Sequence, residues 1–115
     1  MLSVPEISEE YRYPGPVAVL VNKESGSASE LFSGILQKNK RAVLIGTNTA
    51  GKVLLKSMFN FDEDSMLLLI TARGHFADGE VFDFNGLVPD YAVQDEKADL
   101  IRYAAEKLQS NASVH

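Results

Sequence analysis

The 115-residue sequence contains no cysteine and no tryptophan. Without cysteine the chain forms no disulfide, no cysteine-rich zinc site and no thiol nucleophile, but many exported proteins also lack cysteine, so the redox compartment stays open. No apolar run reaches the roughly 18 residues that a membrane-spanning helix requires. The first residues are polar and acidic, where a secretory signal has a basic flank and an apolar stretch. We therefore expect no membrane segment, and any chemistry must come from other side chains.

Basic residues are also few and scattered. Eleven Lys and Arg stand against sixteen Asp and Glu, which gives a net charge of -5. Surfaces that bind nucleic acid or anionic membranes need clustered basic residues, so we expect a protein, peptide or small-molecule partner and no nucleic acid. The length and the hydrophobic fraction of 45% suit one small globular domain with a single core.

The first ordered part of the chain is predicted to be a strand, a helix and a second strand. The run PVAVLVN at residues 16–22 is typical of a strand buried on both faces of a parallel sheet. A helical pattern begins at Ser27 and places Leu31 and Ile35 on one face. RAVLIG at residues 41–46 then resembles a second buried strand. Three such elements within about 30 residues form a βαβ unit, which predicts an α/β fold.

The middle of the chain is predicted to be a β-hairpin. Its strands are residues 53–61 and 66–73, joined by the acidic turn DEDS. Asp78-Gly79 and Asn85-Gly86 predict tight turns around the short VFDF segment. The stretch LVPDYAV predicts a short extended segment whose Pro89 suits the edge of a sheet.

The ends of the chain are predicted to differ in order. Residues 1–15, with their prolines and glutamates, predict an irregular lead-in or linker. A final helix is expected to begin at or beside Asp95, with an apolar face of Leu100, Ile101, Ala104, Ala105 and Leu108. Residues 111–115 are expected to fray.

Ser27 is the first candidate for chemistry, because the sequence GSASE places its hydroxyl where a buried strand turns into a helix. The N–H groups at a helix start have no intrahelical partner and can stabilise an oxyanion on a carbonyl that the serine attacks. Ser27 and Glu30 also match the S-x-x-E capping box, in which both side chains only satisfy the helix start. The residues alone leave both interpretations open.

Lys52 is the second candidate, at the end of a glycine-bearing loop directly after the second strand. Both candidates follow neighbouring parallel strands, so they are expected at the same carboxyl edge of the sheet, where active sites of open α/β sheets gather. An ammonium acts as a base at neutral pH only where burial or nearby positive charge lowers its pKa. The alternative is a solvated loop lysine.

Residues 46–52 also match the G-x-x-x-x-G-K part of a nucleotide-binding loop. That loop must continue with Ser or Thr and open a helix, whereas here Val53 follows and begins an expected strand. No later apolar strand ends in a metal-binding aspartate, since MLLLI runs into Thr71. The nucleotide-binding hypothesis is therefore rejected.

Histidine and metal chemistry have little support. His75 stands alone between Gly74 and Phe76 and is expected to be a loop or packing residue. The acidic residues of the hairpin turn lack the ligand spacing of a calcium loop and are expected to be solvated. We expect no metal and no cofactor.

Taken in order, these motifs resemble the tail-specific or carboxyl-terminal processing proteases of peptidase family S41, whose core is similar to the Clp-protease and crotonase fold. In that family an apolar strand leads into a G-S-A-S-E type turn, a helix, a second strand and a loop of the form G-x-x-T-x-G-K, here Gly46, Thr49, Gly51 and Lys52. The downstream stretch matches at Arg73, Gly79, Gly86, Pro89 and Asp90. The resemblance implies a Clp-protease/crotonase-like βαβ core with an added hairpin and a C-terminal helix, a partial peptidase domain over residues 16–110.

The resemblance also implies roles for particular residues. The family's nucleophile and lysine lie 25 positions apart, which selects Ser27 over Ser25 and Ser29 when paired with Lys52. The implied reaction is acyl transfer at a protein or peptide carbonyl, with Lys52 as base and the Ala28 N–H as half of the oxyanion hole. Such a dyad uses no metal and no cofactor.

The chain departs from the family pattern in two ways. The family commonly has a glutamine four residues beyond the lysine, presumed to orient it, and Lys56 stands there. The family's preceding half-domain and its peptide-binding PDZ domain are not in this sequence, so the resemblance implies a fragment with little peptidase activity of its own. It further implies periplasmic or otherwise extracytoplasmic placement, and exposed sheet edges that favour a homo-oligomer. The alternative function is a non-catalytic ligand- or peptide-binding module on the same fold.

Overall fold

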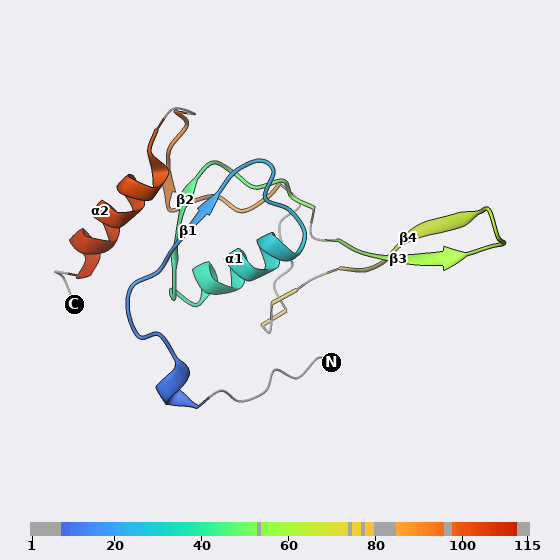
Figure 1. Ribbon diagram of the computed structural model, residues 1–115, viewed down its shortest axis with the longest axis horizontal. Coiled ribbons are helices and arrows are strands. Elements are labelled where there is room, and N and C mark those ends of the chain that lie inside the picture. Colours follow the sequence, from blue (N-terminus) through green and yellow to red (C-terminus); the bar gives the residue numbers. More distant parts are fainter. Residues whose placement is uncertain are drawn as a thin grey trace.

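The computed structural model describes residues 8–52, 54–73, 75–76, 78–79, 85–95 and 98–112. The VFDF segment, Val53 and the ends of the chain lie outside the described residues. Figure 1 shows the described elements in chain order: a 3-10 turn η1 (Glu9–Tyr11), β1 (Ala18–Val21), α1 (Ala28–Lys38), β2 (Val43–Gly46), β3 (Leu54–Asn60), β4 (Met66–Arg73), β5 (Tyr91–Ala92) and α2 (Leu100–Ala112).

The predicted βαβ unit is confirmed. β1 and β2 pair in parallel with α1 between them, and β5 adds a third parallel strand on the other side of β2. Leu44 and Ile45 are neighbours in β2, so their side chains point to opposite faces, and both are fully buried. α1 packs on β2, and α2 packs on β1 and β2. The sheet is therefore the α/β core that the sequence predicted, with β5 and its preceding Pro89 at one edge.

Three large aliphatic side chains predicted to be buried are exposed. Leu20 is 40% exposed, because it lines the groove beside α1, and α1 packs on β2 and leaves the edge strand β1 partly uncovered. Ile35 is 48% exposed, because α1 turns the smaller Ser33 and Gly34 toward the sheet. Ile101 is 76% exposed on α2, whose Ala104 is buried instead. Small residues on both helices allow a close approach to the sheet and leave larger apolar side chains outside.

The predicted hairpin is confirmed as the antiparallel pair β3 and β4, which projects away from the core (Figure 1). The turn is closed by Phe61 N–H, which donates to the Ser65 carbonyl. Met58 pairs with Leu68 and the adjacent Phe59 with Leu67, so both faces of the ribbon carry apolar side chains. Eight of these are between 39% and 75% exposed: Met58, Phe59, Phe61, Met66, Leu67, Leu68, Leu69 and Ile70.

The C-terminal helix begins later than the sequence suggested. α2 starts at Leu100 and is capped by Asp99, whose carboxylate accepts the Arg102 N–H at 3.1 Å. Asp95 instead closes a turn in which its carbonyl accepts the Ala98 N–H at 3.0 Å. The helix continues to Ala112, past the expected start of fraying. Asp99 is the cap because it lies directly before the first helical residue, whereas Asp95 lies five residues before it.

The described part of the lead-in is fastened to the core. The Arg41 guanidinium donates to the Gly15 carbonyl at 3.0 Å and also to the Tyr13 carbonyl. The domain boundary predicted at residue 15 stays a prediction. Within the described ranges, neither helix combines the length and apolarity that crossing a bilayer requires.

Candidate active site

Ser27 lies at the junction between β1 and α1, as predicted, and it is the N-cap of α1. Its φ of 55° and ψ of -121° lie in a region that side chains other than glycine rarely adopt. Such strain persists only where surrounding contacts hold it, and it clusters at functional sites. A strained turn from strand to helix also exposes the nucleophilic serine of α/β-hydrolases. The Ser27 side chain is accordingly exposed to solvent.

Glu30 is the buried centre of the site. Its side chain is fully buried, and its Oε2 accepts the Ser27 N–H at 3.0 Å. This contact is the carboxylate half of the capping box that the sequence predicted.

The same carboxylate binds the loop after β2. Oε2 accepts the Lys52 N–H at 2.8 Å, while Oε1 accepts the Gly51 N–H at 2.6 Å and the Thr49 hydroxyl at 2.7 Å. Because the nitrogens of Ser27 and Lys52 both lie within about 3 Å of one oxygen, they are less than about 6 Å apart. The backbones of the two predicted site residues are thus brought together.

The described contacts include no hydrogen bond between the side chains of Ser27 and Lys52, and Lys52 is exposed. The Lys52 side chain is long and flexible, and its backbone nitrogen lies less than about 6 Å from that of Ser27. Catalytic hydrogen bonds are often loose without substrate.

Ala28 is the first residue of α1, and the role predicted for its N–H in an oxyanion hole stays a prediction. The Ser27 N–H is already engaged by Glu30, whereas no acceptor is recorded for the Ala28 N–H within the described part of the chain. A groove of about 400 Å³ runs beside Ala28, between α1 and β1, and is lined by Leu20 and Phe32 among others.

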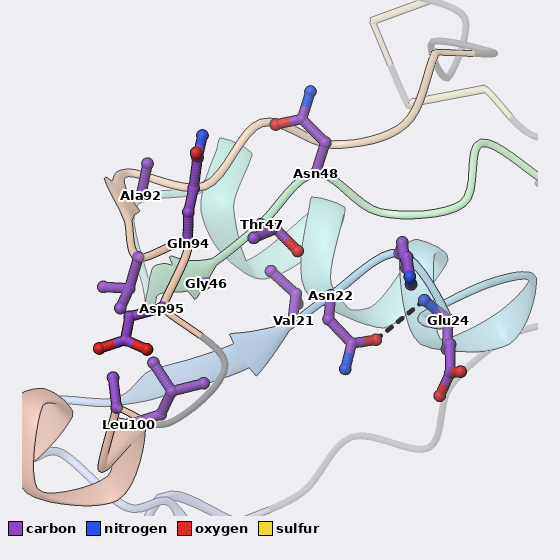
Figure 2. A pocket seen from close by; sticks show the side chains of 13 residues that line it. Val21, Asn22, Glu24, Gly46, Thr47, Asn48, Ala92, Gln94, Asp95 and Leu100 are labelled. Atoms are coloured by element: carbon purple, nitrogen blue, oxygen red, sulfur yellow. Dashed lines mark hydrogen bonds between the residues drawn. The ribbon is translucent and has the colours of Figure 1, made fainter.

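A larger cleft of about 840 Å³ lies at the carboxyl ends of the parallel strands, next to the start of α2 (Figure 2). Asn22, Thr47 and Gln94 give it a polar lining, and the Asn22 Oδ1 accepts the Glu24 N–H at 2.8 Å. Ser27 does not line this cleft.

Lys56 is exposed in β3, opposite Ile70. Among the described residues no hydrogen bond or ion pair joins Lys56 to Ser27 or Lys52, so its orienting role stays a prediction. His75 is exposed and its Nδ1 lies 3.0 Å from the Phe76 carbonyl oxygen. The described residues hold no group of three or more potential ligands placed for a metal ion.

Gly86 and Asp90, two of the downstream residues that match the family pattern, pack against the loop after β2 and against β2 itself. Gly86 has a φ of +89°, and a Cβ there would lie 2.2 Å from the Thr49 carbonyl oxygen. The Asp90 carboxylate accepts the Leu44 N–H at 2.7 Å, which ties the segment before β5 to β2. Gly79 also has a φ of +89° but is exposed, and the side chain of Arg73 lies outside the described part.

Burial raises the pKa of the Glu30 carboxyl, but the four hydrogen bonds that it accepts outweigh burial and hold the pKa below its ordinary value of 4.5. A pKa that is lower in the folded state contributes stability above the unfolded value, and this stability is lost as pH falls through the folded value. The free energy of unfolding should therefore decrease below about pH 4.5. Denaturant unfolding at pH 7, 4.5 and 3 measures the decrease.

Glu30→Gln is the control, because other carboxylates, including Asp62 with its own lowered pKa, also titrate there. The variant should be less stable at pH 7 and should lose less stability on acidification. Equal acid sensitivity of both proteins would contradict the assignment of an ionised, hydrogen-bonded Glu30.

A parallel α/β core thus carries a strained serine at a helix start, and one buried carboxylate joins this serine to the loop that ends at Lys52. The sequence model described as "Peptidase family S41" matches residues 3–93, and the chain belongs to this family.

Named relatives agree with this assignment. The chain is 41% identical over 76 residues to the carboxyl-terminal-processing peptidase 2, chloroplastic, of Arabidopsis thaliana, covering 66% of this chain and 15% of that protein. It is 32% identical over 101 residues to the carboxy-terminal processing protease CtpA of Bacillus subtilis, covering 88% and 21%. The solved photosystem II D1 C-terminal processing protease superposes with a TM-score of 0.62 at 32% identity, covering 70% of this chain and 21% of that chain. The chain thus spans about a fifth or less of the length of these relatives.

Proposed function

We propose that this chain carries the Ser27/Lys52 dyad of a serine endopeptidase that cleaves proteins or peptides near their C-termini by acyl transfer. One observation carries the proposal: a single buried oxygen of Glu30 accepts the N–H of both residues, at 3.0 and 2.8 Å. A helix cap requires only the contact to Ser27. The added contact to Lys52 is what a dyad needs, because it fixes the Lys52 backbone next to Ser27, so that the lysine side chain starts close to the serine.

In the proposed reaction a neutral Lys52 amine takes the proton of the Ser27 hydroxyl while Oγ forms a bond to the peptide carbonyl carbon. The carbonyl oxygen becomes an oxyanion, to which the Ala28 N–H donates. The C–N bond then breaks, and the leaving amine receives the proton from Lys52. Water, deprotonated by Lys52, attacks the carbonyl carbon of the Ser27 ester. When the C–Oγ bond breaks, Lys52 returns the proton to Oγ, which releases the acid product and restores the serine.

The proposed enzyme is longer than this chain, since the matching segments make up only 15% and 21% of two relatives. We propose that the full-length protein adds an N-terminal half of the catalytic domain, which supplies the second oxyanion donor and covers Lys52, and a PDZ domain that binds the substrate peptide. We also propose a periplasmic or otherwise extracytoplasmic location. Cell fractionation with an antibody against this chain tests the location, and recovery only with the cytoplasm would contradict it.

The test of the function is cleavage of an unstructured peptide with a free C-terminus. The full-length protein should cleave it, whereas the isolated chain should show little activity, because Lys52 is exposed and the second oxyanion donor is expected from the remainder of the protein. Mass spectrometry of the products measures both. Failure of the full-length protein on a panel of such peptides would contradict the function. Robust cleavage by the isolated chain, abolished by Ser27→Ala, would contradict the proposed need for further chain.

The exposure of Lys52 is also the one observation that favours the alternative, a non-catalytic module that binds peptides or other ligands on this fold. In that case Ser27 serves only as a cap. Peptide binding by the full-length protein, with an affinity that Lys52→Ala leaves unchanged and with no cleavage, would establish the alternative.

We further propose that the isolated chain forms a homo-oligomer through the β3–β4 hairpin. A lone two-stranded ribbon is marginally stable in water. Its eight exposed apolar side chains present on the order of 100 Å² each, and because they are divided between the two faces of the ribbon, one face offers about 400 Å² per protomer. Two copies that join one face each would bury about 800 Å² in total, which is the area of a small interface.

Leu68→Lys should shift the isolated chain toward the monomer in size-exclusion chromatography with light scattering. Ile101→Lys is the matched control, since it places the same charge on an exposed apolar position of α2 and should leave the oligomer unchanged. A wild-type chain that is monomeric at high concentration would contradict this proposal, as would equal effects of both variants.

A further inference from the structure

Glu30 and Thr49 join three segments that are far apart in the sequence. Glu30 comes from the first turn of α1, Thr49 from the loop after β2, and Leu87 from the segment before β5. The Thr49 hydroxyl donates to Glu30 Oε1 at 2.7 Å and accepts the Leu87 N–H at 2.7 Å. The Thr49 N–H donates to the Leu87 carbonyl at 3.1 Å. The hydroxyl of Thr49 thus connects the carboxylate to a third segment.

Burial makes these bonds strong constraints. Glu30 is fully buried and Thr49 is 5% exposed. A buried charge is tolerated only where hydrogen bonds saturate it, and here two donors reach each carboxylate oxygen. Movement of the loop after β2 or of the segment before β5 would leave a buried donor or acceptor unpaired. The positions of the three segments are therefore coupled.

A capping function does not account for this arrangement. The cap is complete with the contact between Ser27 and Glu30, and the remaining three donors belong to the loop that ends at Lys52. A second hydrogen bond joins the loop after β2 to the turn between β1 and α1, since the Ala50 N–H donates to the Ser25 carbonyl at 2.9 Å. The contacts hold the backbone of both site residues and leave their side chains exposed.

We propose that Glu30 and Thr49 are positioning residues of the dyad. Glu30 holds Ser27 in its strained conformation and sets the distance to the Lys52 backbone, while Thr49 orients the carboxylate through the fixed Leu87 segment. Neither residue touches the substrate. This inference rests on the proposed function, and it predicts that loosening the network lowers the reactivity of Ser27 without weakening substrate binding.

The experiment uses the full-length protein with two readouts: kcat and KM for a peptide, and the rate at which a fluorophosphonate modifies Ser27. Glu30→Gln removes two of the four acceptor sites, and Thr49→Val removes the hydroxyl at nearly constant shape. Thr49→Ser restores the hydroxyl. Thr71→Val is the matched control, because it removes an exposed hydroxyl of the hairpin that lies 2.7 Å from the Ser57 Oγ, and among the described residues no hydrogen bond joins it to Glu30 or Thr49.

Glu30→Gln and Thr49→Val should lower kcat and the modification rate by about 10- to 100-fold, with KM within about twofold, since small misplacements of reacting groups have effects of this size. Thr49→Ser should recover most of the loss, and Thr71→Val should match the wild type. Equal kcat and modification rate in wild type, Glu30→Gln and Thr49→Val would overturn the positioning role alone.

Other outcomes also decide the question. A rise in KM at constant kcat would overturn the positioning role, because it would place the network in substrate binding. If neither Glu30→Gln nor Thr49→Val folds, the network serves stability and the positioning role is overturned as well. A wild-type protein that neither cleaves nor reacts would overturn the proposed function itself, which separates that failure from the failure of this inference.

Discussion

Ser27→Ala in the full-length protein should reduce kcat for peptide cleavage by about 10⁴-fold or more, and Lys52→Ala should have an effect of similar size. The first change removes the atom that bonds to the carbonyl carbon, and the second removes the base that takes its proton. Because the two act as a unit, the double variant should lose no more than either single variant. Initial rates with a fluorogenic or mass-analysed peptide give kcat and KM.

Two neighbouring residues provide controls for this result. Ser29→Ala makes the same chemical change two residues further along α1 and should leave kcat within about threefold. Lys56→Ala removes the second lysine and should lower kcat by less than about tenfold, as expected of an orienting group. The dyad assignment would be contradicted if Ser29→Ala or Ser25→Ala abolished cleavage while Ser27→Ala retained it.

Gly46→Ala should destabilise the fold by about 3 kcal/mol or more, a large part of the 5–15 kcal/mol available to a small domain. Gly46 ends β2 with a φ of +136°, and a Cβ there would lie 2.0 Å from the Val21 carbonyl oxygen. The substitution therefore combines an unfavourable backbone conformation with a clash against β1. Thermal and denaturant unfolding of the isolated chain measure the loss.

Gly26→Ala is the matched control. A Cβ at Gly26 would meet the Ala50 and Lys52 Cβ atoms at 3.5 and 3.9 Å, which are ordinary contacts, and Gly26 has no positive φ. Its effect should stay within about 1 kcal/mol. Equal stability of the two variants would contradict the described packing of β2 against β1.

The sequence predicted the parts of the fold that depend on local pattern. Residues 16–22 and 41–46 each form one apolar run, so their pairing as parallel strands around a helix followed directly. The hairpin followed from two apolar runs around an acidic turn. The exposure of Ile35 and Ile101 could not be predicted this way, because periodicity does not say which side of an apolar helix faces the sheet.

The sequence predicted which residues form the site, but it did not predict the hydrogen bonds that hold them together. Motif order and spacing selected Ser27 and Lys52, and the capping-box pattern selected Glu30 for a single contact. The three contacts of Glu30 to the loop after β2 depend on the path of that loop, which no local pattern encodes. One signal was present: Glu30 shares a helical face with the small residues Ser33 and Gly34, and that face proved to be the buried one.

The central claim is that Ser27 is a nucleophile activated by Lys52, and the most direct measurement is the site of covalent modification by a fluorophosphonate in the full-length protein. Peptide mapping by mass spectrometry should place the phosphonyl group on Ser27, at a rate that falls by about 100-fold or more in Lys52→Ala. Absence of modification at Ser27, or an unchanged rate without Lys52, would contradict the account.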